Sequence, residues 1–309
     1  MVDSRTPQRA ATEPEIATPA LVRIENVSKE YHLGDASLLA LRQINLNIHS
    51  GVFMALAGPS GSGKTTLLNL IGCIDTPTNG RIVIAGLDVT GRTADELATL
   101  RARTIGFIFQ TFNLLPVLSA QENVEYPLLQ FEELSAAGRR ERVMHFLDLV
   151  GLREFARHRP NQLSGGQRQR VAIARALAVQ PKMVLADEPT ANLDHKTGKG
   201  ILRLMRRLNR QTGVTFVFST HDQRVIDMAH RRVDLEDGEI VRLGVRTGKE
   251  WVYAMERPYD PQDDDVETES KAMPSASTEA NGEVTRTKRS RKRKPWVSGE
   301  TSSGETSND

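Results

Sequence analysis

The sequence predicts an α/β fold built around a parallel β-sheet, and three observations lead to this prediction. Residues 183–188 (MVLADE) and 214–220 (VTFVFST) are nearly continuous apolar runs, as expected of strands that are covered on both faces. Residues 52–58 (VFMALAG) run through a glycine-rich loop into an apolar helix, GKTTLLNLIGCI. The third observation is the helical stripe between the two apolar runs, formed by Ile201, Leu202, Leu204, Met205 and Leu208.

The remaining elements follow in chain order. Residues 1–20 are rich in Ala, Thr, Pro and charge, which predicts a disordered leader. Strands are predicted at 21–27, 44–49, 80–86 and 104–110, and residues from about 111 to 175 read as mainly helical, with Val143, Phe146, Leu147 and Val150 on one face. Residues 245–309 are predicted to be a largely disordered extension that carries the basic run 288–294 (KRSRKRK), so the folded domain is expected to span 21–244.

Composition limits the classes of function. The 309 residues carry a net charge of +2, which by itself gives no reason to expect a strongly anionic partner. No stretch reaches the roughly 18 to 20 apolar residues that cross a bilayer, and the first twenty residues contain no apolar run of a secretory signal. One cysteine, Cys73, excludes an intrachain disulfide, fits a reducing cytosol and is expected to be a buried structural thiol.

Residues 58–65 (GPSGSGKT) match a phosphate-binding loop in full. Glycines let successive backbone N–H groups turn toward phosphates, and the following helix adds the positive end of its dipole. Lys64 can reach the phosphates as a point charge, and the Thr65 hydroxyl can bind Mg²⁺. The rival interpretation, a glycine-rich surface turn, does not explain the flanking strand and helix. The predicted phosphate contacts are Gly58, Pro59, Ser60, Gly61, Ser62, Gly63, Lys64, Thr65 and Thr66.

Two acidic residues end the apolar strand 183–188. Adjacent side chains on a strand point to opposite sides, so Asp187 can hold a Mg²⁺ ion while Glu188 faces an attacking water. Glu188 is the better candidate for a general base because it does not neutralise the metal. Without the phosphate loop upstream, an Asp-Glu pair after a strand would be an ordinary turn.

A second anion-binding helix start is predicted at residues 163–167 (LSGGQ). Ser164 occupies an N-cap position before the helix RQRVAIARALAVQ, and Gly165 and Gly166 expose backbone N–H groups, with Gln167 next. An ordinary capped helix without a ligand is the rival interpretation. It explains the cap but not the whole pentapeptide.

These motifs together resemble the ATPase subunits of ABC transporters. The resemblance covers about residues 21–243, and its motifs occur in the same order as in that family. The motifs are GPSGSGKT, Gln110 after FIF, LSGGQ, VLADEP, ANLD (191–194) and Thr220-His221. The resemblance implies a P-loop NTPase (RecA-like) core with a parallel sheet, an antiparallel β subdomain and an inserted α-helical subdomain. It also implies ATP hydrolysis with Mg²⁺ and a head-to-tail dimer in which the LSGGQ of one copy completes the phosphate loop of the other.

The resemblance implies four further roles. Tyr31 would stack on adenine, although a lone Tyr near a strand is more often a packing residue. Gln110 would contact Mg²⁺ and the attacking water, and Asp194 would contact the opposite subunit. His221 would contact the γ-phosphate, with capping of the helix DQRVIDMAH as the rival role.

Within the family, residues 31–41, IGCIDTPTNG and IGFIFQTFNLLPVLSAQENV resemble the branch that drives lipoprotein release and macrolide export. That branch implies an integral membrane permease as partner and a peripheral position on the cytoplasmic face of the inner membrane. Our hypothesis is that an apolar patch receives a coupling helix of the permease, with packing inside the helical subdomain as the rival. The patch consists of Phe112, Leu114, Leu115, Pro116 and Leu118.

Several alternatives stay open. The basic run 288–294 is first of all a solvated end, but it could bind anionic lipid or, without specificity, nucleic acid. The ATPase could regulate a membrane protein that transports nothing, as in cell-division relatives. A nucleic-acid ATPase is disfavoured by the single cassette, the single cysteine and the lack of heptads. The transported substrate is not encoded in this chain.

Overall fold

The computed structural model describes residues 20–34, 36–248 and 250–256. Residues 1–19 of the predicted leader (1–20) and most of the predicted extension, including the basic run 288–294, lie outside the described residues. Ala20, the last residue of the predicted leader, begins a strand. In the described part the strands form two sheets, one of seven and one of four strands.

The seven-stranded sheet has the order β11-β10-β9-β3-β8-β7-β6. Strands β9, β3, β8, β7 and β6 pair in parallel, and β10 and β11 extend this sheet by antiparallel pairing. The bounds are β3 Phe53–Ala57, β6 Ile105–Ile108, β7 Met183–Asp187, β8 Thr215–Ser219, β9 Arg231–Glu236, β10 Glu239–Thr247 and β11 Glu250–Glu256. The predicted parallel sheet is confirmed.

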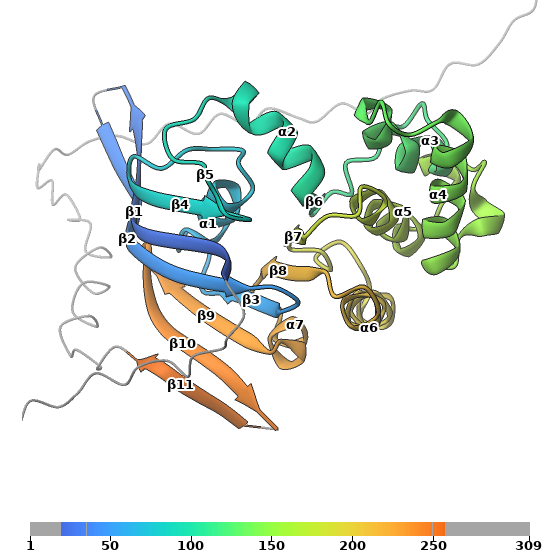
Figure 1. Cartoon of the computed structure of the whole chain (residues 1–309). Helices are drawn as coiled ribbons and strands as arrows, with labels where there is room; N and C mark the ends of the chain where they lie inside the picture. Colours follow the sequence, from blue (N-terminus) through green and yellow to red (C-terminus); the bar gives the residue numbers. More distant parts are fainter. Residues whose placement is uncertain (1–19, 35, 249, 257–309) are drawn as a thin grey trace, which may run out of the picture. The chain divides into compact units, whose positions relative to one another are not determined.

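The four-stranded sheet is antiparallel, with the order β2-β1-β4-β5. Its strands are β1 Ala20–Leu33, β2 Ala36–His49, β4 Asn79–Ile84 and β5 Leu87–Asp88. Strands β1 and β2 pair from one end to the other as a long hairpin (Figure 1). This sheet is the antiparallel β part that the family resemblance implies.

The helices fall into two groups. α1 Lys64–Ile71, α2 Ala94–Thr104, α6 His195–Thr212 and α7 Gln223–Met228 alternate with strands. The second group lies between β6 and β7 in the chain and gathers beyond the β6 edge of the sheet (Figure 1). It comprises α3 Ala120–Glu125, η1 Tyr126–Gln130, α4 Ala136–Leu149, η2 Arg153–Phe155, η3 Pro160–Gln162 and α5 Gly165–Ala178. The helical character predicted for about 111–175 lies in this group.

The core is divided by the parallel sheet, which explains its continuous apolar strands. In β3, Phe53 and Ala55 face one cluster, which also contains the buried sides of α5 and α6. Met54 and Leu56 face the other cluster, built with α1 and the antiparallel sheet. Because both faces of β3 are buried, no polar residue lies between its apolar ones.

The sheet ends later than the sequence predicts, at Glu256 rather than at residue 244. Composition placed residues 245–256 with the polar tail, but two cation–π contacts join β10 to β11. The Arg246 guanidinium lies 5.8 Å from the Trp251 ring centre, and Arg242 lies 5.1 Å from that of Tyr253. Trp251 also packs against the buried core, so this tryptophan belongs to the domain. Within the described residues, no helix has both the length and the apolar character needed to cross a membrane.

Candidate active site

One cavity of about 960 Å³ lies at the carboxyl ends of β3, β7 and β8. In an open α/β sheet this is the edge where ligands bind. Most of the predicted site residues line it. The lining residues are Tyr31, Leu38, Leu39, Ala40, Arg42, Ser60, Gly61, Gly63, Lys64, Thr65, Thr66, Gln110, Asp187, Glu188, Ser219, His221, Asp237 and Gly238.

The loop between β3 and α1 requires its glycines for two reasons. Gly58, Gly61 and Gly63 have φ values of 146°, 83° and 96°, which residues with a side chain rarely adopt. A Cβ on Gly58 would lie 2.1 Å from the carbonyl oxygen of Leu235, and one on Gly63 would lie 2.8 Å from that of Ala40. The loop therefore closes over the start of α1 with its backbone exposed to the cavity.

Lys64, the first residue of α1, is held by the loop that precedes it. Its ammonium group donates to the Gly58 carbonyl at 2.9 Å and also to the Pro59 carbonyl. Burial lowers the pKa of Lys64, while the carboxylates of Glu188 and Asp187 oppose that shift. The ammonium group therefore lies in a partly desolvated site close to two acids, where an anionic ligand would find a fixed positive charge.

Thr65 and Asp187 provide oxygen ligands of the kind that Mg²⁺ prefers. The Thr65 hydroxyl lies 3.5 Å from a carboxylate oxygen of Asp187, so the two groups fit one small ion. No group of three or more His, Cys, Asp or Glu side chains is placed to hold an ion anywhere in the described part of the chain. An ion at Thr65 and Asp187 would take its other ligands from groups outside this class, such as the Gln110 side chain on the same cavity, phosphate oxygens and water.

Glu188 follows β7 in a left-handed backbone conformation, with φ of 43°. Its amide donates to the Ser219 carbonyl at 2.9 Å, which continues the pairing of β7 with β8. Its carboxylate accepts from the Thr220 hydroxyl at 3.3 Å and lies 2.6 Å from Nδ1 of His221. Glu188 is therefore fixed by its neighbours from β8 and lies on the cavity wall.

His221 contacts Glu188 and is not the N-cap of α7. The N-cap of α7 is Asp222, whose side chain accepts from the Arg224 amide, so the capping role considered for His221 is wrong. The His221 side chain is 76% exposed toward the cavity that it lines. One ring nitrogen meets Glu188, and the other is available to a ligand.

Tyr31 lies on β1 at the cavity, where a network anchors its hydroxyl. The hydroxyl donates to Asp75 at 2.8 Å, and Lys29 donates to the other carboxylate oxygen of Asp75 at 2.7 Å. Burial raises the pKa of Tyr31, and the bond to Asp75 raises it further. With its hydroxyl engaged, the ring remains as the part of Tyr31 that can meet a ligand.

Gln110 lies just after β6 and lines the cavity. Its backbone carbonyl accepts from the Asn192 side chain at 2.8 Å. Asn192 belongs to the ANLD segment before α6, so two predicted motifs that are far apart in the sequence are bonded to each other. Nothing in the sequence pattern indicated this bond.

The LSGGQ residues do not line the cavity. The Ser164 hydroxyl accepts from the Gln167 amide at 3.3 Å, and the Gln167 side chain accepts from the Ser164 amide at 2.8 Å, which forms a capping box at the start of α5. A Cβ on Gly166 would lie 2.5 Å from a methyl carbon of Thr197 on α6. The capping box and the close contact of Gly166 give part of this motif a structural role, and the motif lies apart from the cavity of the phosphate loop.

Asp194 also lies outside the cavity, as the N-cap of α6. Its carboxylate accepts from the Thr197 amide at 3.0 Å. Bonds from Thr197 hold the pKa of Asp194 below its ordinary value, so this exposed side chain is anionic. The single chain brings the phosphate loop, Asp187, Glu188 and His221 together, and leaves LSGGQ and Asp194 apart from them.

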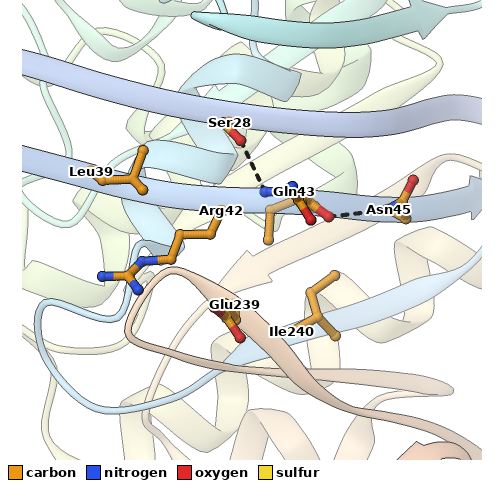
Figure 2. A pocket seen from close by; sticks show the side chains of 8 residues that line it. Ser28, Leu39, Arg42, Gln43, Asn45, Glu239 and Ile240 are labelled. Carbon is orange, nitrogen blue, oxygen red and sulfur yellow. Dashed lines mark hydrogen bonds between the residues drawn. The ribbon is translucent and has the colours of Figure 1, made fainter.

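The sequence did not single out Leu38, Leu39 or Arg42, although all three line the cavity. Leu38 pairs with Tyr31 across the β1–β2 hairpin and is 56% exposed. The adjoining cavity of about 560 Å³ shares Leu39 and Arg42, and Figure 2 shows both beside Gln43 on β2. The adjacent apolar residues Leu38 and Leu39, close to Tyr31 in the chain, were the available sequence signal.

Comparisons with known proteins agree with the family that the motifs indicate. Residues 41–191 match the family described as ABC transporter. The chain is 49% identical over 226 residues to the ABC transporter ATP-binding protein MJ0796 of Methanocaldococcus jannaschii, covering 72% of this chain and 96% of that protein. It is 48% identical over 229 residues to the lipoprotein-releasing system ATP-binding protein LolD of Anaeromyxobacter dehalogenans, covering 74% and 95%.

A third relative is larger than this chain. The macrolide export ATP-binding/permease protein MacB of Brucella melitensis is 46% identical over 226 residues, which are 73% of this chain but only 35% of MacB. Among solved structures, dimeric MJ0796 in a post-hydrolysis state bound to ADP and Pi is similar, with a TM-score of 0.68 and 47% identity, covering 74% of this chain and 99% of that one.

Proposed function

Because this chain belongs to the ABC transporter ATPase family, we propose that its cavity binds ATP with Mg²⁺ and that hydrolysis there drives a membrane permease for export or for extraction of a substrate such as a lipoprotein. The chain is an ATP-hydrolysing subunit of an ABC transporter. The observation that carries the proposal is the meeting of Lys64, Asp187, Glu188 and His221 on one cavity.

The predicted site residues on the cavity have distinct proposed tasks. The phosphates lie in the loop 58–65, where backbone N–H groups and the Lys64 ammonium meet their charge. Thr65, Asp187 and Gln110 would hold Mg²⁺, which when bound neutralises phosphate charge. Glu188 accepts the proton of the attacking water, and His221 orients Glu188 through the 2.6 Å contact while its other nitrogen meets the γ-phosphate. Tyr31 stacks on the adenine.

The site is completed by a second copy of the chain. Ser164, Gly165, Gly166 and Gln167 form an anion-binding helix start that is outside the cavity of their own chain, which supports binding to the nucleotide of a partner copy. Asp194, exposed at the start of α6, would contact the partner. MJ0796 forms a dimer in its post-hydrolysis structure.

Substitution of Glu188 by Gln tests the assignment of the base. The amide keeps the size of the side chain but cannot take a proton, so we expect normal ATP binding, a loss of turnover of about 10²-fold or more, and a persistent ATP-bound dimer on gel filtration. Lys64→Ala is the contrasting variant, because it should weaken ATP binding itself. A Glu188→Gln chain that hydrolyses ATP at the normal rate would overturn the role of Glu188.

A groove beside the helical group is the proposed docking site for the permease. A cavity of about 360 Å³ lies between α2, β6, α5 and η1, and Phe107, Phe109 and Pro127 line it. In the stretch of chain from Asn113 to η1, Val117 is 72% exposed, and Leu115 and Leu129 are also exposed. Such an apolar groove with exposed aliphatic residues suits an amphipathic helix. Leu114, by contrast, packs against the buried core, so the rival role of interior packing applies to Leu114.

Variants at exposed side chains test this groove, because they should not disturb the folded core. Val117→Asp and Leu129→Asp should abolish co-purification with the permease while ATP binding and the thermal midpoint stay unchanged, because neither side chain is buried. Leu114→Asp serves as the contrasting variant, since it should lower the thermal midpoint by placing a charge against the core. Normal assembly of the two exposed variants would reject the groove as the docking site.

The names of the relatives support the branch. LolD belongs to a lipoprotein-releasing system, and MacB joins its ATP-binding part to a permease. We therefore place this chain at the cytoplasmic face of the inner membrane, bound peripherally to a permease that supplies the substrate path. Contact of the basic run 288–294 with anionic lipid remains a prediction, as that run lies outside the described residues.

A further inference from the structure

A basic cavity, called here the arginine cavity, lies in the helical group. Its volume is about 520 Å³. Arg140 reaches it from α4, Arg153 from η2, and Arg157 from the loop after η2. Gln121 lines it from α3, and Figure 1 shows α3 and α4 together in the helical group. The arginine cavity shares no lining residue with the proposed nucleotide cavity, so the two are separate sites.

The three arginines of this cavity are not neutralised by acids. Within the part of the chain that the structure describes, their guanidinium groups form no side-chain hydrogen bond and no ion pair. Other arginines of the helical group and its surroundings are paired, as in the contacts of Arg103 and Arg139 with glutamates at 2.6 and 3.3 Å. Three arginines and one glutamate give the arginine cavity a net charge of +2, with its histidine counted as neutral.

His158 gives an independent indication of a ligand. Its ring forms part of the wall, and its Nδ1 is buried without a hydrogen-bond partner among the described residues. The backbone of His158 is fixed on both sides, because its amide donates to Phe155 at 2.9 Å and its carbonyl accepts from Ala120 at 2.8 Å. Buried polar atoms nearly always bond to protein, to an ordered water or to a bound group. The wall therefore contains a polar atom that a ligand, or a water bound with it, would satisfy.

We propose that the arginine cavity binds a phosphate group. A guanidinium presents a planar fork of N–H donors that matches phosphate oxygens in pairs. Three such forks from three segments match the several oxygens of a tetrahedral phosphate, whereas a planar carboxylate offers only two oxygens. Met144, one turn after Arg140 on α4, and Ala156 add apolar surface for the carbon part of a phosphate ester.

Two sources supply this chemistry, a soluble phosphate ester and a phospholipid headgroup. The headgroup is a source because α3 leads directly into η1, and η1 lines the groove proposed to receive the permease. The arginine cavity thus belongs to the part of the chain that we place next to the membrane partner. The phosphate site itself does not depend on that placement, since its residues are the same for either source.

Glycerol 3-phosphate is the probe for the soluble source. Calorimetry on the full chain, with ADP and Mg²⁺ in excess to occupy the phosphate loop, should show one bound ester per chain. The double variant Arg153→Gln/Arg157→Gln should raise the dissociation constant about tenfold or more, because charge-assisted bonds are lost. Both arginines are exposed, so the thermal midpoint should not change. Lys64→Ala should leave this binding intact, which separates it from nucleotide binding.

The matched control is Arg203→Gln/Arg210→Gln, which removes the same charge from exposed positions on α6. It should leave the dissociation constant unchanged. A tenfold or greater loss in the first double variant and none in the control would support the site, whereas equal losses in both would reduce the effect to net charge and overturn it.

Vesicles of phosphatidylcholine with phosphatidic acid are the probe for the lipid source. Every variant keeps the basic run 288–294, so a loss of flotation confined to Arg153→Gln/Arg157→Gln reports the arginine cavity. Loss with either the ester or the vesicles supports the proposal and identifies the source. If neither probe binds through these arginines, the proposal is wrong. It is equally wrong if a glutamate-rich peptide binds through them and both phosphate probes do not, because the cavity would then be a protein-docking site.

Discussion

At the scale of single residues, some of the strained backbone positions of this protein lie at or next to the candidate site. Glu188 has a left-handed backbone, and Phe112 and Asn113 follow Gln110 with the same strain. Each such residue costs about 1–3 kcal/mol, which the surrounding bonds must offset. For Glu188 those bonds come from Ser219, Thr220 and His221. The direction of the proposed general base is thus fixed at a cost in local backbone stability.

Cys73 gives a pH-dependent prediction at the same scale. The thiol is buried directly after α1, and burial raises its pKa from 9.0 to about 11. The folded chain therefore keeps the proton at pH values where the unfolded chain loses it. Below pH 9.0 this group adds no pH dependence, and between 9.0 and about 11 the free energy of unfolding should fall as pH rises.

Two measurements check Cys73. Iodoacetamide at pH 8 should label the folded protein far more slowly than the urea-unfolded protein, because the thiolate is scarce and shielded in the fold. Cys73→Ala should reduce the fall in unfolding free energy between pH 9.0 and about 11 while leaving the slope at neutral pH unchanged. Rapid labelling of the folded chain would show that the thiol is accessible.

At the scale of elements, close backbone contact decides where small residues are required. A Cβ on Gly106 in β6 would lie 2.4 Å from the Ala176 carbonyl oxygen, so α5 packs with its backbone directly on this strand. Gly200 on α6 has no atom within 4 Å of its would-be Cβ. The two glycines therefore have opposite requirements, although both lie inside regular elements.

Alanine substitutions at these glycines should change stability in opposite directions. Gly106→Ala should lower the free energy of unfolding by about 1–3 kcal/mol, because backbone must move to admit the methyl group. Gly200→Ala should raise it by about 0.5–1 kcal/mol, since alanine favours the helix and nothing obstructs it. Urea denaturation midpoints of both variants provide the measurement. An unchanged midpoint for Gly106→Ala would contradict the close contact.

The elements with a strong local pattern could be predicted, and those that depend on distant partners could not. Apolar runs predicted β7 and β8, because burial on both faces leaves a signal within the strand itself. β11 was missed, since its stability comes from pairing with β10 and from contacts of Trp251 and Tyr253 rather than from its own composition. The bond of Asn192 to the Gln110 carbonyl was missed for the same reason.

At the scale of the whole molecule, the motifs divide into two surfaces. The phosphate loop, Asp187 and Glu188 share one cavity, whereas Ser164 and Asp194 lie outside it. The sequence alone predicted each motif but could not show that one chain keeps them apart. A closed two-fold assembly with two identical composite sites follows if each chain lends its second surface to the other.

Mixing two inactive variants tests this division. Lys64→Ala disables the phosphate loop but leaves LSGGQ intact. Gly165→Asp does the reverse: it places a negative charge where phosphates would bind, and a helix start tolerates Asp, with the nearest atom 3.4 Å from the would-be Cβ. Each variant alone should hydrolyse almost no ATP. In an equal mixture about half of the dimers pair the two variants and contain one intact site, so activity should recover to about a quarter of normal.

The matched control is a mixture of Lys64→Ala with Glu188→Gln. Both substitutions lie on the same surface, so each site of the mixed dimer keeps one defect and no activity should return. Recovery in the first mixture and none in the second is expected only if Lys64 and Glu188 act together and Gly165 acts from the other chain. If the first mixture forms dimers yet stays inactive, the composite site is wrong; if the control recovers, Lys64 and Glu188 do not serve the same nucleotide.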